Sequence, residues 1–196
     1  SPGYYVDTPA SASQTACSPG SYNPATASDN NSACLDADLG YYVSQSGRST
    51  QTPASTGHYV DTVGASTDIP CSAGTYNPDT GSNDSSACQD ADLGYYVNQQ
   101  GRAFQSPAMP GYYVDTTGAT EQIACLPGTY NPNSTSTVAT DCMDADLGYY
   151  ATGPGNFEPT PASPGYYVDT TAATVPIACS PGSYNQETAS TDASAC

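Results

Sequence analysis

Apolar and aromatic residues recur along the chain in a short motif, Gly-x-Tyr, and not at the 3.6-residue period of an amphipathic helix. The motif includes all 17 tyrosines of the sequence. Its leading glycines are Gly3, Gly20, Gly40, Gly57, Gly74, Gly94, Gly111, Gly128, Gly148, Gly165 and Gly182. Proline and glycine interrupt every run that is long enough for a helix, so the pattern predicts an all-β chain.

Each motif predicts one small, irregular β-hairpin. A strand rich in Tyr and Val, as at 111–114, leads into a turn of Gly, Asn, Asp and Ser and then into a Thr-rich return strand. A second glycine follows seven residues after the first in six motifs, at Gly47, Gly64, Gly81, Gly101, Gly118 and Gly155. The leading glycine is expected to provide either a positive φ angle or a close approach between backbones, and the sequence leaves both explanations open.

An isolated hairpin is only marginally stable in water, so we expect the hairpins to stack on one another. The third motif position is Tyr in every motif, whereas the position before it varies. We therefore expect the rings at Tyr22, Tyr76, Tyr113 and Tyr167 to pack on neighbouring rings. They should be more buried than the residues that precede them, which are Ser21, Thr75, Tyr112 and Tyr166.

The motifs and the cysteines share one long period. Successive motifs lie 17, 20 and 17 residues apart, which gives a repeat of 54 residues with three sub-repeats. The chain then divides into repeats 1–56, 57–110 and 111–164 and a partial repeat, 165–196. Such regularity predicts a tandem array in which one geometric step recurs, and so an elongated rod. Since Ser1 already falls inside a repeat, we expect the chain to be either a processed product or a segment of a longer array.

The composition excludes several classes of protein. Leu, Ile, Val and Phe total 19 residues, there is no Trp, and the net charge is −17, a combination typical of disorder. The regular tyrosines and eight cysteines favour a stapled repeat protein with small cores instead. Arg48 and Arg102 are the only basic residues apart from one His, which excludes nucleic-acid binding. No apolar run has the length of a membrane span.

The eight cysteines favour disulfides over metal ligation. Zinc sites use pairs of ligands two to four residues apart, whereas no two cysteines here are closer than 17 residues. An even number of cysteines in a lysine-free, Ser/Thr-rich chain indicates an oxidising, extracellular setting.

Four segments open with Cys-x-x-Gly-x-Tyr and read CSPGSY, CSAGTY, CLPGTY and CSPGSY. In this the chain resembles the cysteine-rich repeats of the ephrin-receptor-like and TNF-receptor-like kind. The resemblance covers the second sub-repeat well and the other two weakly, and it implies an extended extracellular stalk without receptor signalling. It also implies the disulfides Cys17–Cys34, Cys71–Cys88, Cys125–Cys142 and Cys179–Cys196.

A repeated Asp-x-Asp allows two interpretations. The pairs are Asp36 and Asp38, Asp90 and Asp92, and Asp144 and Asp146. Two carboxylates could begin a calcium shell, which takes six to eight oxygen ligands. The rest of a known calcium motif is missing, so the favoured interpretation is turn and surface residues that keep the array hydrated. We expect no cofactor, with calcium as the alternative.

Covalent glycans are expected on the polar loops. Ser and Thr make up about a quarter of the chain and often lie beside Pro, as O-glycosylated segments do. Asn30, Asn83 and Asn133 each begin an Asn-x-Ser/Thr sequence, the acceptor for N-glycans. Ordinary polar loops would account for these three residues equally well.

No set of residues indicates an enzyme. His58 is the only histidine and stands where the equivalent residue is usually Tyr, so we interpret it as an aromatic substitution. We therefore expect a non-catalytic, structural extracellular protein that self-associates into a filament, stalk or sheath. The alternative is an adhesin or receptor-stalk module that binds a carbohydrate or protein ligand. Such a module should carry a non-repeating patch, and the most irregular stretch, 151–157, is short.

Overall fold

The computed structural model describes residues 1–8, 11 and 13–196. Within these residues the fold is all-β, as predicted, with ten separate two-stranded antiparallel sheets and no α-helix. Each sheet is one hairpin whose strands are two residues long. The first strand always consists of the second and third residues of a Gly-x-Tyr motif. The motif at Gly182 has no strand assigned among the described residues.

The hairpins follow one another in sequence order. They are β1 (Tyr4–Tyr5) with β2 (Thr15–Ala16), β3 (Ser21–Tyr22) with β4 (Leu35–Asp36), β5 (Tyr41–Tyr42) with β6 (Thr52–Pro53), β7 (His58–Tyr59) with β8 (Ile69–Pro70), β9 (Thr75–Tyr76) with β10 (Gln89–Asp90), β11 (Tyr95–Tyr96) with β12 (Ser106–Pro107), β13 (Tyr112–Tyr113) with β14 (Ile123–Ala124), β15 (Thr129–Tyr130) with β16 (Met143–Asp144), β17 (Tyr149–Tyr150) with β18 (Thr160–Pro161), and β19 (Tyr166–Tyr167) with β20 (Ile177–Ala178). Four 3₁₀ turns complete the fold: η1 (Asn31–Ala33), η2 (Ser85–Ala87), η3 (Ala139–Asp141) and η4 (Ala193–Ala195).

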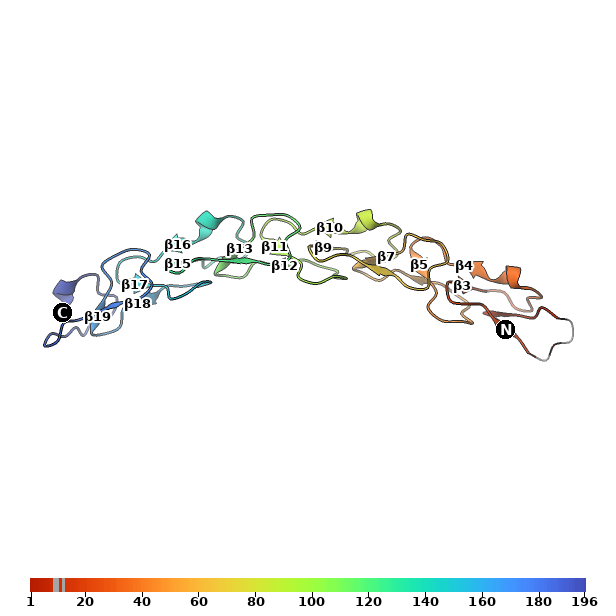
Figure 1. Cartoon of the computed structure of the whole chain (residues 1–196), viewed down its shortest axis with the longest axis horizontal. Coiled ribbons are helices and arrows are strands. Elements are labelled where there is room, and N and C mark those ends of the chain that lie inside the picture. The colour runs from red at the N-terminus through yellow and green to blue at the C-terminus, as the bar shows by residue number, and fades with distance from the viewer. Residues whose placement is uncertain (9–10, 12) are drawn as a thin grey trace. The chain divides into compact units, whose positions relative to one another are not determined.

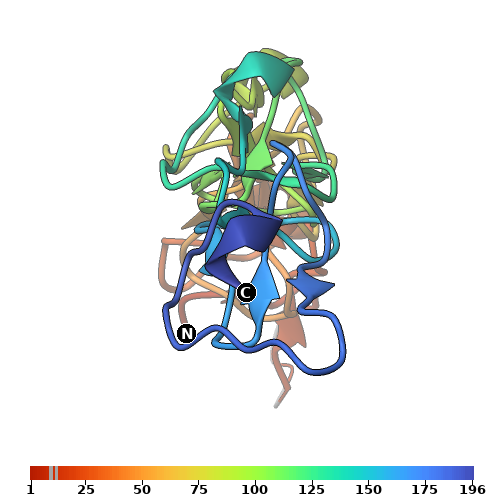
Figure 2. The ribbon, with the colours of Figure 1, turned by 90° about the vertical axis from the view of Figure 1, so that its left-hand side faces the viewer.

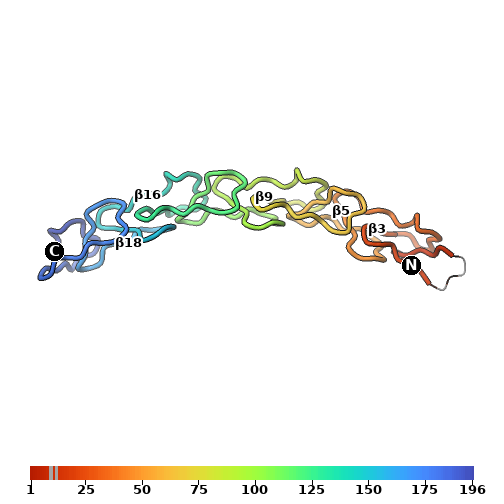
Figure 3. Tube along the Cα trace, in the orientation of Figure 1, coloured from red at the N-terminus to blue at the C-terminus, as the bar shows by residue number. Residues whose placement is uncertain are grey.

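The chain forms two compact units, which do not follow the boundaries of the 54-residue repeats. The first unit comprises Ser1–Asp90 with Val97–Gln105, and the second comprises Ala91–Tyr96 with Ser106–Cys196. In the first unit the hairpins succeed one another from the N-terminus, as the ribbon and the Cα trace both show (Figures 1 and 3). Figure 2 views the second unit from the end that carries the C-terminus, with the blue coil of η4 nearest the viewer.

Each hairpin begins with a tight turn that ends in the motif. The Tyr41 N–H donates to the Asp38 carbonyl at 3.0 Å, and Gly40 between them has a φ of 82°. This is a type II turn, whose third position favours glycine and whose second position favours proline. Proline occupies that second position at Pro2, Pro19, Pro110, Pro127, Pro164 and Pro181. The dipeptide Pro-Gly was thus a usable sequence signal for these turns.

The fully buried side chains come from two small positions in each hairpin. One position lies three residues after the motif glycine, and the other directly follows the return strand. The first holds Val43, Val60, Val97, Val114, Val168, Ala151, Asn23, Asn77 and Asn131, and the second holds Cys17, Cys71, Cys125, Ala37, Ala54, Ala91, Ala108, Ala145 and Ala162, all 0–2% exposed.

The prediction that the motif tyrosines form the buried core is wrong. No tyrosine is among the buried residues of the described chain. Tyr22, Tyr76 and Tyr113 are half-buried like the residues before them, whereas Tyr167 is half-buried and Tyr166 before it is 41% exposed. Neighbouring hairpins are joined backbone to backbone, so the space between them fits Val, Asn, Cys or Ala but no aromatic ring. The tyrosines therefore pack along the edges of the stack, where a polar hydroxyl can remain in contact with water.

Backbone hydrogen bonds join each hairpin to the next in the same way. The Gly57 N–H donates to the Asn77 carbonyl at 2.7 Å, and the Val60 N–H donates to the Ser82 carbonyl at 2.9 Å. The same two offsets from the motif glycine recur from hairpin to hairpin, with Val, Asn or Ala at the second donor. We call these the stacking bonds. The structural step is consequently one hairpin, whereas the 54-residue period marks only every third step.

A third stacking bond skips one hairpin. Its donor is the N–H of the residue seven positions after a motif glycine. Its acceptor is the carbonyl of the residue that directly follows the return strand two hairpins earlier. An example is the Gly155 N–H, which donates to the Cys125 carbonyl at 2.9 Å. The carbonyl oxygen of Gly155 also lies where a Cβ on Gly111 would be, and Gly111 has a φ of 88°. Both explanations proposed for the leading glycine are therefore correct, because the residue has a positive φ and another backbone approaches it closely.

The position seven residues after the motif glycine has a positive φ even where it is not glycine. Ala27, Thr135, Ala172 and Ala189 have φ angles of 54–58° there. A left-handed conformation costs an L-residue about 1–2 kcal/mol, partly offset by the greater freedom of glycine in the unfolded chain. We expect Ala172→Gly to raise the free energy of unfolding by about 0.5–1 kcal/mol. Urea unfolding followed by tyrosine fluorescence measures the change.

The reverse substitution provides the control. Gly64 occupies the same position with a φ of 74°, and a Cβ there would meet only the Asp36 side chain, at an ordinary contact distance of 3.6 Å. Gly64→Ala should therefore lower stability by a similar amount. Equal stability of all three proteins would mean that this turn tolerates either residue.

Candidate functional site: the repeated disulfide junction

Three disulfides join consecutive hairpins, and a fourth joins the last hairpin to the segment that follows it. Their partners are those that the family resemblance implied: Cys17–Cys34, Cys71–Cys88, Cys125–Cys142 and Cys179–Cys196, each with a Cα–Cα distance of 5.6 Å. The first cysteine of a pair follows the return strand of one hairpin, and at the first three junctions the second lies in the connection of the next hairpin. A disulfide therefore links one hairpin to the next segment of the chain and does not close a loop within one hairpin. We call each such place a disulfide junction.

A 3₁₀ turn precedes the second cysteine of each junction, and at three of the four junctions a side chain caps it. At η2 the Asp84 side chain accepts a hydrogen bond of 2.7 Å from the Ser86 N–H. The Ser86 side chain, followed by its backbone N–H, holds the pKa of the Asp84 carboxyl below its ordinary value. Ser194 lowers the pKa of the Asp192 carboxyl at η4 in the same way. Since a side-chain cap compensates otherwise unpaired N–H groups, these turns are locally stabilised.

A buried asparagine locks the second hairpin of each junction onto the first. The Asn77 amide nitrogen donates to the His58 carbonyl at 2.9 Å and to Ser82 Oγ at 2.8 Å. The Asn77 Oδ1 accepts from the Asp79 N–H at 3.1 Å. The equivalent residues Asn23, Asn131 and Asn185 make the same three contacts. The interpretation based on tyrosine did not predict the role of these asparagines. The sequence signal for them is an Asn that directly follows Gly-x-Tyr and precedes Pro or Gln.

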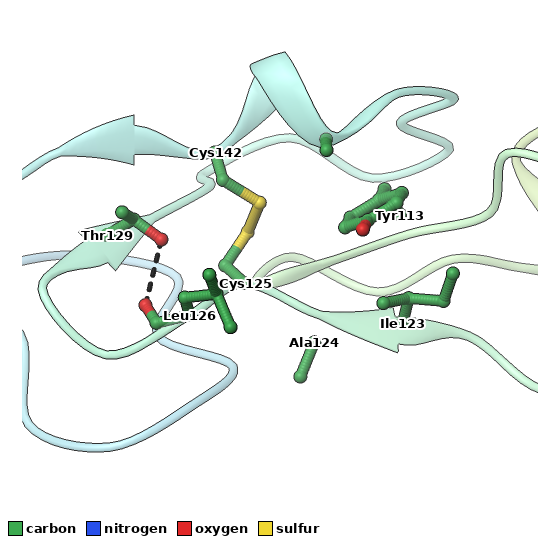
Figure 4. A pocket seen from close by; sticks show the side chains of 8 residues that line it. Tyr113, Ile123, Ala124, Cys125, Leu126, Thr129 and Cys142 are labelled. Atoms are coloured by element: carbon green, nitrogen blue, oxygen red, sulfur yellow. Dashed lines mark hydrogen bonds between the residues drawn. A yellow bond between two sulfur atoms is a disulfide. The ribbon is translucent and has the colours of Figure 1, made fainter.

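A small cavity lies beside the disulfide at three of the junctions. Around Cys125–Cys142 it has a volume of about 220 Å³, and Tyr113, Ile123 and Leu126 are among its lining residues (Figure 4). The cavities at Cys17–Cys34 and Cys71–Cys88 measure about 260 and 220 Å³. The same tyrosine position lines all three cavities, so the motif tyrosine has a place in a surface pocket and not in the core.

The third junction is more apolar than the first two. Leu126 occupies the position of Ser18 and Ser72, and Ala139 occupies that of Asn31 and Ser85. Leu126 is 72% exposed. Val138 replaces the side-chain cap that Asn30, Asp84 and Asp192 provide at the other junctions. Leu126 and Val138 are thus exposed apolar residues that the equivalent positions of the other junctions lack, and the stretch 151–157 carries another, Phe157.

The junction disulfides should contribute to stability mainly through the unfolded chain. Ala occupies the position of Cys71 in the two following hairpins, at Ala91 and Ala108, so the site accepts Ala sterically. We expect the double change Cys71→Ala with Cys88→Ser to lower the free energy of unfolding by about 3 kcal/mol, the value for a loop of this length. Non-reducing thermal unfolding measures the loss.

Reduction of the unsubstituted protein provides the control for that variant. Dithiothreitol should lower the stability of the unsubstituted protein more than the double substitution does, because it breaks three more disulfides. In dithiothreitol the variant and the original protein should have similar free energies of unfolding. A variant as stable as the oxidised original would contradict a stapling role for this bond.

The structure places the Asp-x-Asp pairs at the ends of hairpins. Asp38, Asp92 and Asp146 begin type II turns, with their carbonyls accepting from the Tyr41, Tyr95 and Tyr149 N–H groups, which supports the turn interpretation. Gln51 also donates to the Asp38 carboxylate at 2.7 Å. Asp36, Asp90 and Asp144 end return strands and are exposed. Within the described part of the chain no three His, Cys, Asp or Glu side chains converge, and calcium stays an untested alternative.

The three candidate N-glycan acceptors are exposed. Asn30 caps η1, and its Oδ1 accepts from both the backbone N–H and the hydroxyl of Ser32. Asn83 directly precedes the η2 cap residue, and the Asn133 N–H donates to Asn131 at 3.0 Å. All three lie between a motif tyrosine and the second cysteine of a junction. Their exposure is compatible with glycosylation, which stays a prediction.

His58 lies where tyrosine rings lie in equivalent hairpins. Its ring carbon Cε1 is 3.1 Å from the position that a Cβ on Gly101 would take, and the Tyr4 and Tyr112 rings contact Gly47 and Gly155 in the same way. Its Nδ1 is 3.0 Å from the Thr56 carbonyl. The interpretation of His58 as an aromatic substitution is consistent with this placement.

Comparison with protein-family models gives no match, and comparison with curated proteins gives none either. Among the described residues, none of the helical segments has the length and hydropathy needed to cross a bilayer.

Proposed function

We propose that this chain is a structural segment of an extracellular filament, stalk or sheath. The observation that carries the proposal is the recurrence of the same stacking bonds from one motif to the next. Contacts that repeat between neighbours make stability additive along an array, so length can grow without a new core. A role of spacing or cohesion uses this property directly, whereas an active site needs a place that differs from the rest.

The disulfides and the composition support an extracellular setting. Four disulfides among the described residues would persist in an oxidising compartment and be reduced in a cytosol. The net charge of −17 and the Ser/Thr-rich loops would keep the surface hydrated, with glycans on Asn30, Asn83 and Asn133 adding to this effect.

Self-association follows from the chemistry of the stacking bonds. They use backbone N–H and carbonyl groups, so they accept Val, Asn or Ala at the same position. A hairpin of one copy could therefore stack on a hairpin of another through the same groups, as exposed strand edges do. A head-to-tail contact of this kind gives an open fibre unless its rotation happens to close a ring.

Electron microscopy of native material tests the proposal. We expect long uniform fibres, and isolated short rods would favour the binding-module alternative instead. A sample treated with EDTA should keep its fibres, because the aspartates are assigned to turns and surfaces. Fibres that dissolve in EDTA and reform with calcium would instead identify the Asp-x-Asp pairs as ligands.

The binding-module alternative also has a specific observation in its favour. Leu126 and Ala139 make the third junction more apolar than the first two, which have Ser or Asn at the same positions. An exposed apolar patch on an otherwise polar surface is typical of an interaction site. A single module with one such patch could hold a ligand.

A further inference from the structure

The pocket at the third junction requires an apolar occupant. Tyr113, Ile123 and Leu126 line its mouth, and the Cys125–Cys142 disulfide forms part of its wall (Figure 4). Ile123 is 41% exposed and Leu126 is 72% exposed, so both side chains remain in contact with water in the free chain. Covering them would remove apolar area from water, which is favourable in proportion to that area.

The electrostatic surroundings of the pocket favour a cationic neighbour for that occupant. Asp141 and Asp144 flank Cys142 in the sequence, and Asp144 lies in the exposed strand β16. Because both are carboxylates, an acidic group directly beside the occupant would be repelled locally. A fitting occupant is therefore an exposed apolar side chain with a basic residue close to it.

The chain carries such a group itself. Phe104 is 70% exposed, and Arg102, one of only two arginines, lies two residues before it. The equivalent hairpin residues are Arg48 and Thr50, so the arginine recurs but the phenylalanine does not. Phe157 is the only other phenylalanine and is 56% exposed, but Glu158 follows it directly and would face Asp141 and Asp144.

We propose that Phe104 of one copy inserts into the Tyr113–Ile123–Leu126 pocket of a second copy, with Arg102 near Asp141 and Asp144. This inference deepens the proposed function and rests on its self-association. Phe104 and the pocket lie on different surfaces of the same chain, so the contact is heterologous. Each copy can therefore bind one copy through its Phe104 and another through its pocket, and the assembly can continue from copy to copy. This contact would connect copies laterally, in addition to any end-to-end stacking. The bound ring would also shield the junction disulfide from solvent.

Variants copied from the chain's own repeats test the contact with little risk to folding. Leu126→Ser introduces the residue present at Ser18 and Ser72, and Phe104→Thr introduces the residue present at Thr50. Sedimentation velocity of the purified chain measures association between copies. Each variant should raise the dissociation constant at least about tenfold, because burial of one large apolar side chain is lost. Phe157→Thr is the matched control and should leave the constant unchanged.

A photochemical experiment identifies the occupant directly. Replacing Phe104 with p-benzoylphenylalanine and irradiating the assembled protein should crosslink this position to a peptide that contains 123–126 or 139–142 of another copy. Mixing isotopically light and heavy chains distinguishes crosslinks between copies from those within one copy. Crosslinks elsewhere, or only within one copy, would overturn the inference.

The outcomes separate this inference from the proposed function. Fibres that form equally well with Leu126→Ser and Phe104→Thr would leave the structural role standing and refute the pocket contact. Absence of any association in the unsubstituted protein would refute both the self-association and the inference. Loss of association with Leu126→Ser but not with Phe104→Thr would mean that another side chain fills the pocket, and would refute Phe104 as the occupant.

Discussion

Gly111→Ala is expected to lower the free energy of unfolding of the second unit by at least about 3 kcal/mol. Alanine at a φ of 88° costs about 1–2 kcal/mol by itself. In addition, the new Cβ would overlap the Gly155 carbonyl, whose carbon lies 2.6 Å from that position. Because Gly155 is also held by its hydrogen bond to Cys125, the backbone cannot move away without losing a stacking bond.

Gly165→Ala separates the two contributions to that loss. Gly165 has a similar φ of 84°, but no atom lies within 4 Å of the position that its Cβ would take. It should therefore lose only about 1–2 kcal/mol. Urea unfolding followed by tyrosine fluorescence measures both variants, and hydrogen exchange at the Gly155 amide should accelerate only in Gly111→Ala. Equal losses in the two variants would show that the close approach is not important for stability.

Asn77→Asp should have the second large effect, a loss of about 3 kcal/mol at neutral pH. The side chain is completely buried, and its amide nitrogen donates to the His58 carbonyl and to Ser82. A carboxylate of the same shape would direct a negative oxygen at that carbonyl and could not donate. The first hairpin of the junction would thereby lose its side-chain hydrogen bond to the second, while the backbone stacking bonds and the disulfide remained in place.

The pH dependence of the stability of Asn77→Asp distinguishes the loss of a hydrogen-bond donor from a steric effect of the substitution. A protonated carboxyl can donate one hydrogen bond, so the deficit of Asn77→Asp should become smaller at pH 3 than at pH 7. Asn77→Val introduces the residue found at Val60 and Val97 and leaves the same partners unsatisfied without a charge. Its deficit should be independent of pH. A deficit of Asn77→Asp that does not change with pH would contradict the hydrogen-bonding explanation.

The local elements and the covalent links could be predicted from the sequence. Gly-x-Tyr placed the first strand of all ten hairpins correctly, because Pro-Gly turns and β-prone Tyr pairs act within a few residues. The family resemblance supplied all four disulfide partners from the Cys-x-x-Gly-x-Tyr segments. The spacing of the second glycines, such as Gly47 and Gly101, also marked a real requirement for positive φ.

What the tertiary structure decided is the set of contacts between hairpins. Gly111 meets Gly155 two hairpins further on, and such a contact has no trace in a local pattern. The recurrence of Tyr suggested an aromatic core, yet backbone-to-backbone stacking leaves room only for residues such as Val114 and Asn131, next to the tyrosines. Likewise the apolar pocket beside Leu126 depends on 113, 126 and 139 coming together around a disulfide. By itself the sequence determined the hairpins and their staples, because these are local or covalent; the core, the one-hairpin step and the non-repeating surface arise only when separate hairpins pack.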